Sequence, residues 1–271
     1  EQYERKYPEN ILFIKCESKV GVGEARNIGL DYASGKYIAF VDADDRMNPY
    51  MLQKLYEKMA LYELDMAGCG YQSFCGADIL EKFIYTERMY HLRIKEEKKE
   101  FILEQGTKNA VWAHMYKKAF LDEHHILFPK ETYMEDLFFH QLCIMQAESY
   151  YEIAEPLYYY RINPKGIMQQ IDSHYFMDSF RMQNAVYDVL EDNGLQKGFE
   201  EELAVIFYVQ AFVTPLKYMK NETNGIQWDE NLLTVLRNTL LRRFPDIRKN
   251  IYILSDESEY NKQFLRFLEK D

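Results

Sequence analysis

Short apolar runs alternate with amphipathic segments along the first part of the chain. Residues 11–14, 37–41 and 65–71 are apolar or β-branched runs of strand length, bounded by polar or glycine-containing stretches. Between them, residues 24–33 and 50–62 carry apolar side chains at helical spacing. Strands that alternate with helices predict an α/β fold, with a mixed, mostly parallel sheet and flanking helices.

The rest of the chain changes from this alternation to a helical pattern. Beyond residue 71 we predict a charged loop, two helices and one strand, over residues 76–100, 112–124, 135–147 and 150–160. From about residue 173 onward the pattern is helical, with Asn-Gly and Pro turn signals. We therefore expect a sheet-containing domain over residues 1–170 and a helical C-terminal region over residues 171–271.

Composition narrows the classes of function. The net charge is −11, which disfavours nucleic-acid binding, because that binding relies on Lys and Arg to neutralise phosphates. No apolar run reaches the roughly 18 residues that a membrane-spanning helix needs. The four cysteines include no CxxC pair, which favours reduced thiols and a cytoplasmic location.

Five basic residues lie in the predicted helical region, at Arg237, Arg242, Arg243, Arg248 and Lys249. They fit a solvated helix face, and they also fit peripheral contact with the anionic inner face of a membrane. Both interpretations stay open, and so does the formation of a homo-oligomer.

An acidic cluster directly follows the predicted strand at residues 37–41. Asp42, Asp44 and Asp45 lie within four positions of one another, and ionised carboxylates at this spacing repel unless a cation or hydrogen-bond donors compensate them. Ligands of open α/β sheets bind beyond the carboxyl ends of the strands, and carboxylate oxygens suit Mg²⁺ or Mn²⁺. The alternative is that these residues cap a helix that begins near Pro49.

The stretch from Gly21 to Asp45 resembles the centre of family 2 glycosyltransferases, which are inverting enzymes with a GT-A fold. The matching features are GVGEARNIGL at residues 21–30 and ASGKYIAFVDADD at residues 33–45, which ends in a DxD motif. Further similarity includes Glu135-Asp136 after Phe128-Pro129, and it extends over about residues 8–170. The resemblance is to bacterial members that act in surface-polysaccharide synthesis.

The resemblance implies a transferase that uses a nucleotide-diphosphate sugar, most often UDP-linked, and a metal ion, Mn²⁺ or Mg²⁺. It implies a saccharide or lipid-linked acceptor and hexosyltransferase-type chemistry. Carried over residue by residue, Arg26, Asn27 and Asp42 would lie at the nucleotide. Asp44 would be the main metal ligand, with Asp42 and Asp45 beside it.

The resemblance also implies the catalytic base. Asp136 would accept the proton of the acceptor hydroxyl, with Glu135 and Gly23 in supporting positions. Glu135 and Asp136 are neighbours on one predicted helix, so only one of them is expected to reach the acceptor. The alternative for Asp136 is a contact at the N-terminus of that helix.

Members of the family normally open with two strands, the second ending in an Asp-Asp-Gly-Ser-type motif, and this sequence opens with what resembles the helix after them. We therefore expect an N-terminally incomplete GT-A sheet, in which residues 11–14, 37–41 and 65–71 are neighbouring strands. Asp42 and Asp44 should lie at its carboxyl edge. This chain alone is then expected to be weakly active or inactive, and the alternative function is a non-catalytic glycosyltransferase-like fragment or interaction module.

Overall fold

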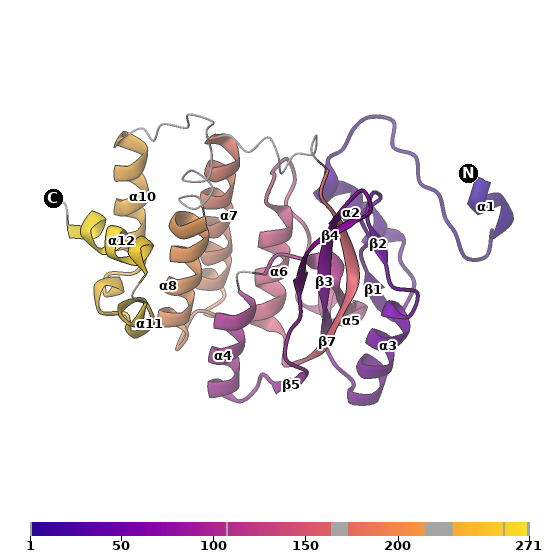
Figure 1. The fold of residues 1–271 in the computed structure, drawn as a ribbon, viewed down its shortest axis with the longest axis horizontal. Coiled ribbons are helices and arrows are strands. Elements are labelled where there is room, and N and C mark those ends of the chain that lie inside the picture. Colours follow the sequence, from indigo (N-terminus) through magenta and orange to yellow (C-terminus); the bar gives the residue numbers. More distant parts are fainter. Residues whose placement is uncertain (1, 107, 164–172, 215–229, 257, 270–271) are drawn as a thin grey trace.

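The computed structural model describes residues 2–106, 108–163, 173–214, 230–256 and 258–269 (Figure 1). The strands are β1 (Tyr37–Ala39), β2 (Arg46–Met47), β3 (Met66–Cys75), β4 (Asp78–Phe83), β5 (Arg88–His91), β6 (His114–Lys117) and β7 (Ser149–Arg161). The α-helices are α1 (Gln2–Lys6), α2 (Val22–Tyr32), α3 (Met51–Tyr62), α4 (Lys95–Gln105), α5 (Lys118–Glu123), α6 (Glu135–Gln146), α7 (Ser173–Asp192), α8 (Glu200–Tyr208), α10 (Glu230–Arg243), α11 (Ile251–Ser255) and α12 (Glu259–Glu269).

The described strands form one mixed sheet in the order β1-β6-β3-β7-β2, with β4 added to β3 and β5 added to β7. β3 and β7 pair in parallel, and the other pairs are antiparallel. β1, β3 and β7 run in the same direction, because β6 is antiparallel to both β1 and β3. The mixed α/β fold with flanking helices is as predicted, although antiparallel pairs outnumber the parallel one.

The strand neighbours differ from the prediction. β6 lies between β1 and β3, so these two strands share a sheet without pairing. Residues 112–124 were predicted to be one helix, but they contain the four-residue strand β6 followed by the short helix α5. The predicted loop at residues 76–100 contains β4, β5 and the start of α4. Such short strands leave little periodicity, and pairing with distant strands decides their conformation.

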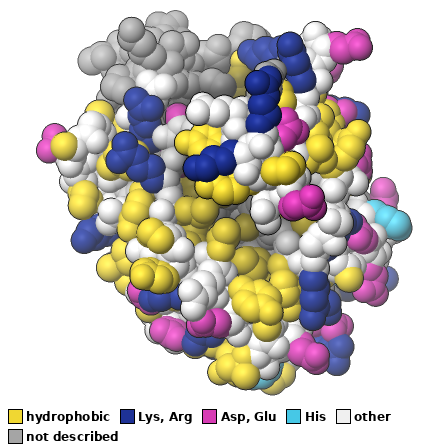
Figure 2. Space-filling view, turned by 90° about the vertical axis from the view of Figure 1, so that its right-hand side faces the viewer, with side chains coloured by type: hydrophobic (Ala, Val, Ile, Leu, Met, Phe, Trp, Pro, Cys, Tyr) yellow, Lys and Arg dark blue, Asp and Glu magenta, His cyan; other side chains and the backbone are white. Residues whose placement is uncertain are grey.

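The predicted buried strand at residues 11–14 is wrong. These residues form no strand, and Ile11, Leu12, Phe13 and Ile14 are 36%, 63%, 47% and 37% exposed. An apolar run becomes a strand only where a partner supplies hydrogen bonds, and the described part of β1 pairs with β6 alone. Figure 2 views the molecule from the side where α3 and the N-terminal segment lie, and it shows hydrophobic side chains gathered around a hollow.

Helices cover both faces of the sheet. Met51, Leu55 and Met59 recur every four residues on α3 and are fully buried, so this stripe packs α3 against β3, β6 and β7. α6 lies on the opposite side of the sheet from α3, and α7 lies beyond α6 (Figure 1). β1 and the turn after it therefore lie between α3 and the N-terminal end of α6.

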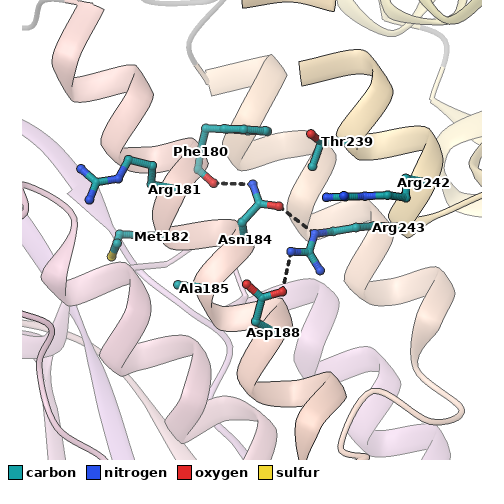
Figure 3. A pocket seen from close by; sticks show the side chains of 9 residues that line it. All are labelled: Phe180, Arg181, Met182, Asn184, Ala185, Asp188, Thr239, Arg242 and Arg243. Atoms are coloured by element: carbon teal, nitrogen blue, oxygen red, sulfur yellow. Dashed lines mark hydrogen bonds and ion pairs between the residues drawn. The ribbon is translucent and has the colours of Figure 1, made fainter. Parts of the chain in front are cut away.

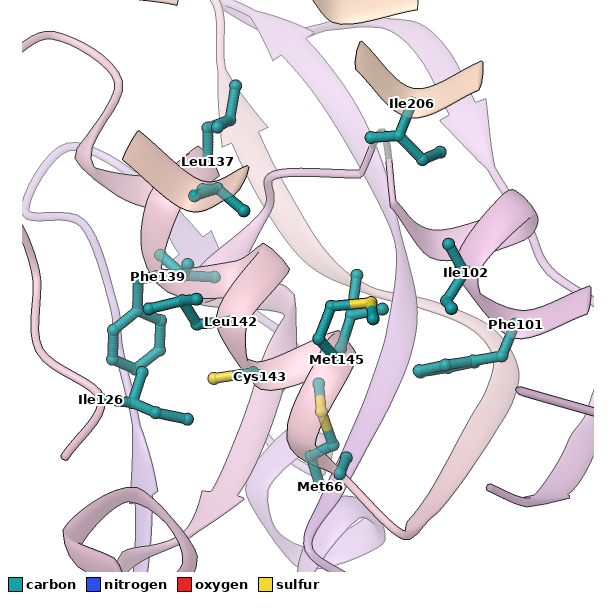
Figure 4. Close-up of a cluster of buried hydrophobic side chains, with 14 of the residues drawn as sticks. Met66, Phe101, Ile102, Ile126, Leu137, Phe139, Leu142, Cys143, Met145 and Ile206 are labelled. Atoms are coloured by element: carbon teal, nitrogen blue, oxygen red, sulfur yellow. The ribbon is translucent and has the colours of Figure 1, made fainter. Parts of the chain in front are cut away.

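The helical C-terminal region packs directly against the sheet-containing part. Figure 4 shows Leu142 and Met145 of α6 in one buried cluster with Phe101 of α4 and Ile206 of α8. The division at residue 170 stays a prediction. No helix in the described ranges combines the length and the apolar character required to span a bilayer.

Candidate active site

One arginine joins the acidic turn after β1 to the start of α6. Arg26 of α2 donates from Nη2 to Asp42 Oδ1 and from Nη1 to Glu135 Oε1, and both distances are 2.9 Å. The side chains of Arg26 and Glu135 are 12% and 11% exposed, and that of Asp42 is 34% exposed. Because a guanidinium group is a planar fork of donors, Arg26 fixes two carboxylates from distant parts of the sequence. The structure thus brings together three residues that the sequence assigned to one site.

Asn27 and Gly23 hold α2 against the segment before α6. Asn27 is buried, its Nδ2 donates to the Phe128 carbonyl, and its Oδ1 accepts from the Phe128 N–H, both at 2.9 Å. A Cβ atom on Gly23 would lie 2.5 Å from the Pro129 carbonyl oxygen. Both amide atoms of Asn27 are therefore bonded to backbone, and the close approach at Gly23 places Arg26 beside Glu135.

Gly23→Ala should lower the free energy of unfolding by about 1–3 kcal/mol, because the added methyl group meets a backbone oxygen that cannot rotate away. Urea unfolding of the purified chain measures this change. Gly29→Ala on the same helix is the matched control, since a Cβ there meets no atom within 4 Å. That control should raise stability by up to about 1 kcal/mol. Equal effects of the two substitutions would contradict the close approach at Gly23.

The acidic turn itself is tied to β7. The Asp45 N–H donates to the Asp42 carbonyl at 3.1 Å. The Tyr158 hydroxyl accepts from the Asp42 N–H at 3.1 Å and donates to Asp45 Oδ2 at 2.8 Å, and the Arg161 N–H donates to Asp45 Oδ1 at 2.7 Å. Burial raises the pKa of the Asp45 carboxyl, while the hydrogen bonds from Arg161 and Tyr158 act in the opposite direction. Asp45 thus fixes the turn in place.

Asp44 is the outward-facing member of the turn. Its side chain is exposed, and no hydrogen bond or ion pair joins it to another residue in the described part of the chain. It follows β1 in the direction of that strand, so its position at the carboxyl edge is as predicted. The carboxylate of Asp44 is therefore accessible to a ligand that approaches from solvent.

The helix-capping alternative for the acidic turn is wrong. α3 begins at Met51 with Tyr50 at its N-cap position, and no side chain caps it. Asn48 rather than an aspartate accepts from the Tyr50 N–H, at 2.9 Å. The acidic residues are therefore not explained by the stability of α3.

A metal ion at the turn would need ligands beyond the described side chains. Within the described ranges, no group of three or more His, Cys, Asp or Glu side chains is arranged to hold a metal ion. Hard divalent cations accept water and phosphate oxygens alongside one or two carboxylates. Asp44 has the right donor chemistry for such a site, with Asp42 two positions before it.

Glu135 and Asp136 begin α6 and face different partners. Glu135 pairs with Arg26, whereas Asp136 is half-buried and its Oδ1 accepts from the Leu137 N–H at 2.8 Å. Burial and then the charge of Glu135 raise the pKa of Asp136 to about 7, and burial also raises the pKa of Glu135. The hydrogen bond from the Leu137 N–H is the contact at the helix N-terminus that was the alternative role for Asp136, and it occupies one of the two Asp136 carboxylate oxygens.

Sequence reasoning missed Tyr158 and Trp112 as parts of this site. Tyr158 is buried, and its ring stacks on Trp112 with centroids 4.3 Å apart. Trp112 also stacks on Tyr160 at 5.6 Å. The Tyr158 ring packs inside the fold, and its hydroxyl also orders the acidic turn.

The chain is similar in sequence to known glycosyltransferases. Residues 1–124 match the model of the family described as Glycosyl transferase family 2. EpsH of Bacillus subtilis (strain 168), whose name describes it as a glycosyltransferase, is 25% identical over 233 residues, which cover 85% of this chain and 66% of EpsH. Glycosyltransferase GlyA of Streptococcus pneumoniae serotype 4 is 30% identical over 173 residues, which cover 59% of this chain and 24% of GlyA.

The fold is similar to that of a solved protein. The crystal structure of S. aureus TarS 1–349 in complex with UDP-GlcNAc superposes with a TM-score of 0.67 at 16% sequence identity, over 93% of this chain and 71% of that one. At this identity the likeness concerns the fold, and it agrees with the predicted GT-A architecture. The chain spans about two thirds or less of the length of the curated relatives that it matches.

Proposed function

We propose that this chain, whose residues 1–124 match the glycosyltransferase family 2 model, is a member of that family and transfers a sugar from a nucleotide-diphosphate sugar to a saccharide or lipid-linked acceptor. The process would be cell-surface polysaccharide synthesis. One observation carries the proposal: Arg26 joins Asp42 of the acidic turn to Glu135, which is adjacent to Asp136. One residue thereby joins the acidic turn, which could bind a diphosphate through a cation, to the start of α6, which carries the proposed base.

A UDP-linked sugar is the proposed donor. The TarS structure with the same fold holds UDP-GlcNAc, and a sheet of this kind binds ligands beyond its strand ends. Asp42 and Asp44 follow β1 at that edge. The departing diphosphate gains negative charge during transfer, so the donor must be stabilised there.

A divalent cation, Mn²⁺ or Mg²⁺, is the proposed cofactor. The exposed Asp44 carboxylate fits it, because it is a hard oxygen donor without a protein partner among the described residues. Asp44 would hold the ion together with Asp42, while Asp45 would keep the turn in place. When bound, the ion would neutralise charge on the diphosphate.

Asp136 is the proposed base. Its carboxylate would take the proton from the acceptor hydroxyl as that oxygen bonds to the anomeric carbon, and the bond to the nucleoside diphosphate would break on the opposite face with inversion. Glu135 is held by Arg26 and would position the start of α6. A carboxyl pKa near 7 lets the group be ionised and still basic at neutral pH.

Asp44→Asn should lower turnover with a UDP-sugar by about 100-fold, because it weakens a hard oxygen ligand. The assay measures UDP release from a panel of UDP-sugars with Mn²⁺ or Mg²⁺ in excess over the protein. Asp31→Asn, at an exposed position of α2, is the control and should leave turnover unchanged. Undiminished turnover in excess chelator would overturn the metal assignment.

The pH profile of kcat/KM should rise with pH up to about 7 and then level off, because the base works only when Asp136 is deprotonated. Glu135→Gln should move this rise to lower pH, since the Glu135 charge is one cause of the raised Asp136 pKa. A profile that stays flat between pH 5 and about 8 in the wild-type protein would contradict Asp136 as the base.

A second candidate function is a non-catalytic interaction module. The observation that favours it is the exposure of the four apolar side chains at residues 11–14. If this candidate holds, the purified chain releases no UDP from any donor tested and binds no UDP by calorimetry. Release that disappears in Asp136→Asn would exclude it.

A further inference from the structure

A cavity of about 490 Å³ that is widely open to solvent lies between α7 and α10, apart from the acidic turn (Figure 3). Its apolar wall includes Phe180 and Met182, which are 8% and 9% exposed, and Ala185. Its polar wall includes Thr239 and Arg242 of α10. An apolar wall facing a few polar groups is the usual form of a site for a small organic ligand.

Arg243 is a neutralised part of this wall. It donates from Nε to Asn184 Oδ1 at 2.7 Å and from Nη2 to Asp188 Oδ1 at 2.6 Å. Glu191 Oε2 lies 3.8 Å from its Nη1. With two carboxylates beside it, the Arg243 guanidinium fastens α10 to α7 and has little remaining charge to offer a ligand.

Arg242 is different. Figure 3 shows its side chain extending from α10 toward α7, next to Arg243, whereas Arg181 points away from both. Arg242 is exposed and forms no ion pair with any residue in the described ranges. An anion beside Arg242 would therefore supply the ion-pair partner that its guanidinium lacks among the described residues.

We propose that this cavity binds a phosphate ester, with the phosphate on Arg242 and Thr239 and the organic group on Phe180 and Met182. The guanidinium fork matches two phosphate oxygens, and a third phosphate oxygen remains to accept a hydrogen bond from the Thr239 hydroxyl. A carboxylate lacks this third oxygen. In a chain of net charge −11, a cation in a hollow without an ion-pair partner among the described residues is a local point of attraction for anions. The site is independent of the proposed transfer reaction.

Two sources can supply the ester: a soluble phosphate ester, or the headgroup of a membrane lipid. Calorimetric titration of the full chain with glycerol 3-phosphate tests the first, with glycerate as the carboxylate counterpart. Co-sedimentation with vesicles of phosphatidylglycerol, against vesicles of phosphatidylcholine, tests the second. Arg242→Gln is the test variant, and Arg266→Gln, an equal charge change at an exposed position of α12, is its control.

Binding of either phosphate probe should weaken about tenfold or more in Arg242→Gln and stay unchanged in Arg266→Gln. Thr239→Val should weaken it severalfold with the charge intact. If Arg242→Gln loses binding of glycerol 3-phosphate, the ligand is a soluble ester. If Arg242→Gln loses only binding to phosphatidylglycerol vesicles, the ligand is a lipid headgroup. The proposal is overturned if glycerate binds as tightly as glycerol 3-phosphate, if neither probe binds the wild-type chain, or if Arg242→Gln binds as well as Arg266→Gln does.

Discussion

Asp136→Asn should lower kcat by about 10²- to 10⁴-fold, the usual contribution of a positioned general base. The asparagine keeps the size of the side chain and can still accept from the Leu137 N–H, so α6 should keep its first turn. Because the base is needed mainly in the transition state, the affinity for UDP should change less than twofold or so. Single-turnover kinetics and calorimetry with UDP measure the two effects separately.

Glu135→Gln is the control for this experiment, because it alters the neighbouring carboxylate that Arg26 holds. It should reduce kcat less than Asp136→Asn does, through a looser start of α6. If Glu135→Gln has the larger effect on kcat and Asp136→Asn stays near the wild-type rate, then Glu135 is the base. Comparable losses of UDP affinity in both variants would instead assign the pair to donor binding.

Much of the site could be predicted because its signals are local. α2, β1 and the acidic turn occupy one continuous stretch, and each is specified by its own periodicity or by neighbouring glycines. The apolar stripe of α3 also follows from spacing alone, since Met51, Leu55 and Met59 must share a face. For these segments, tertiary structure only had to agree with what the local pattern already favoured.

The rest depends on contacts between residues far apart in the sequence. β6 is a strand because it lies between β1 and β3, and residues 11–14 are not a strand because no described strand pairs with them. The hydroxyl of Tyr158 reaches Asp45 across 113 positions, a relation that no local pattern contains. Hydrogen-bond partners at this separation follow from the assembled sheet, whereas the tyrosine run by itself indicates only a strand.

Arg26→Met should lower the free energy of unfolding by about 3–5 kcal/mol, because it leaves the carboxylates of Asp42 and Glu135 without their cation in a largely buried site. Arg93→Met is the matched control: Arg93 pairs with Glu148 at the surface, both side chains are more than half exposed, and solvent screens such a pair, so its loss should change stability little. Urea unfolding compares the two variants.

The triple variant Arg26→Met, Asp42→Asn and Glu135→Gln separates the cost of unpaired charge from the cost of lost packing. It removes all three charges at once, so most of the stability lost in Arg26→Met should return, while UDP-sugar turnover stays low because the link between the acidic turn and α6 is gone. A triple variant as unstable as Arg26→Met would show that the guanidinium acts mainly by packing on Phe128, whose ring centroid lies 5.3 Å from it. If Arg26→Met alone is no less stable than Arg93→Met, then the carboxylates of Asp42 and Glu135 find other partners, and Arg26 does not organise the site.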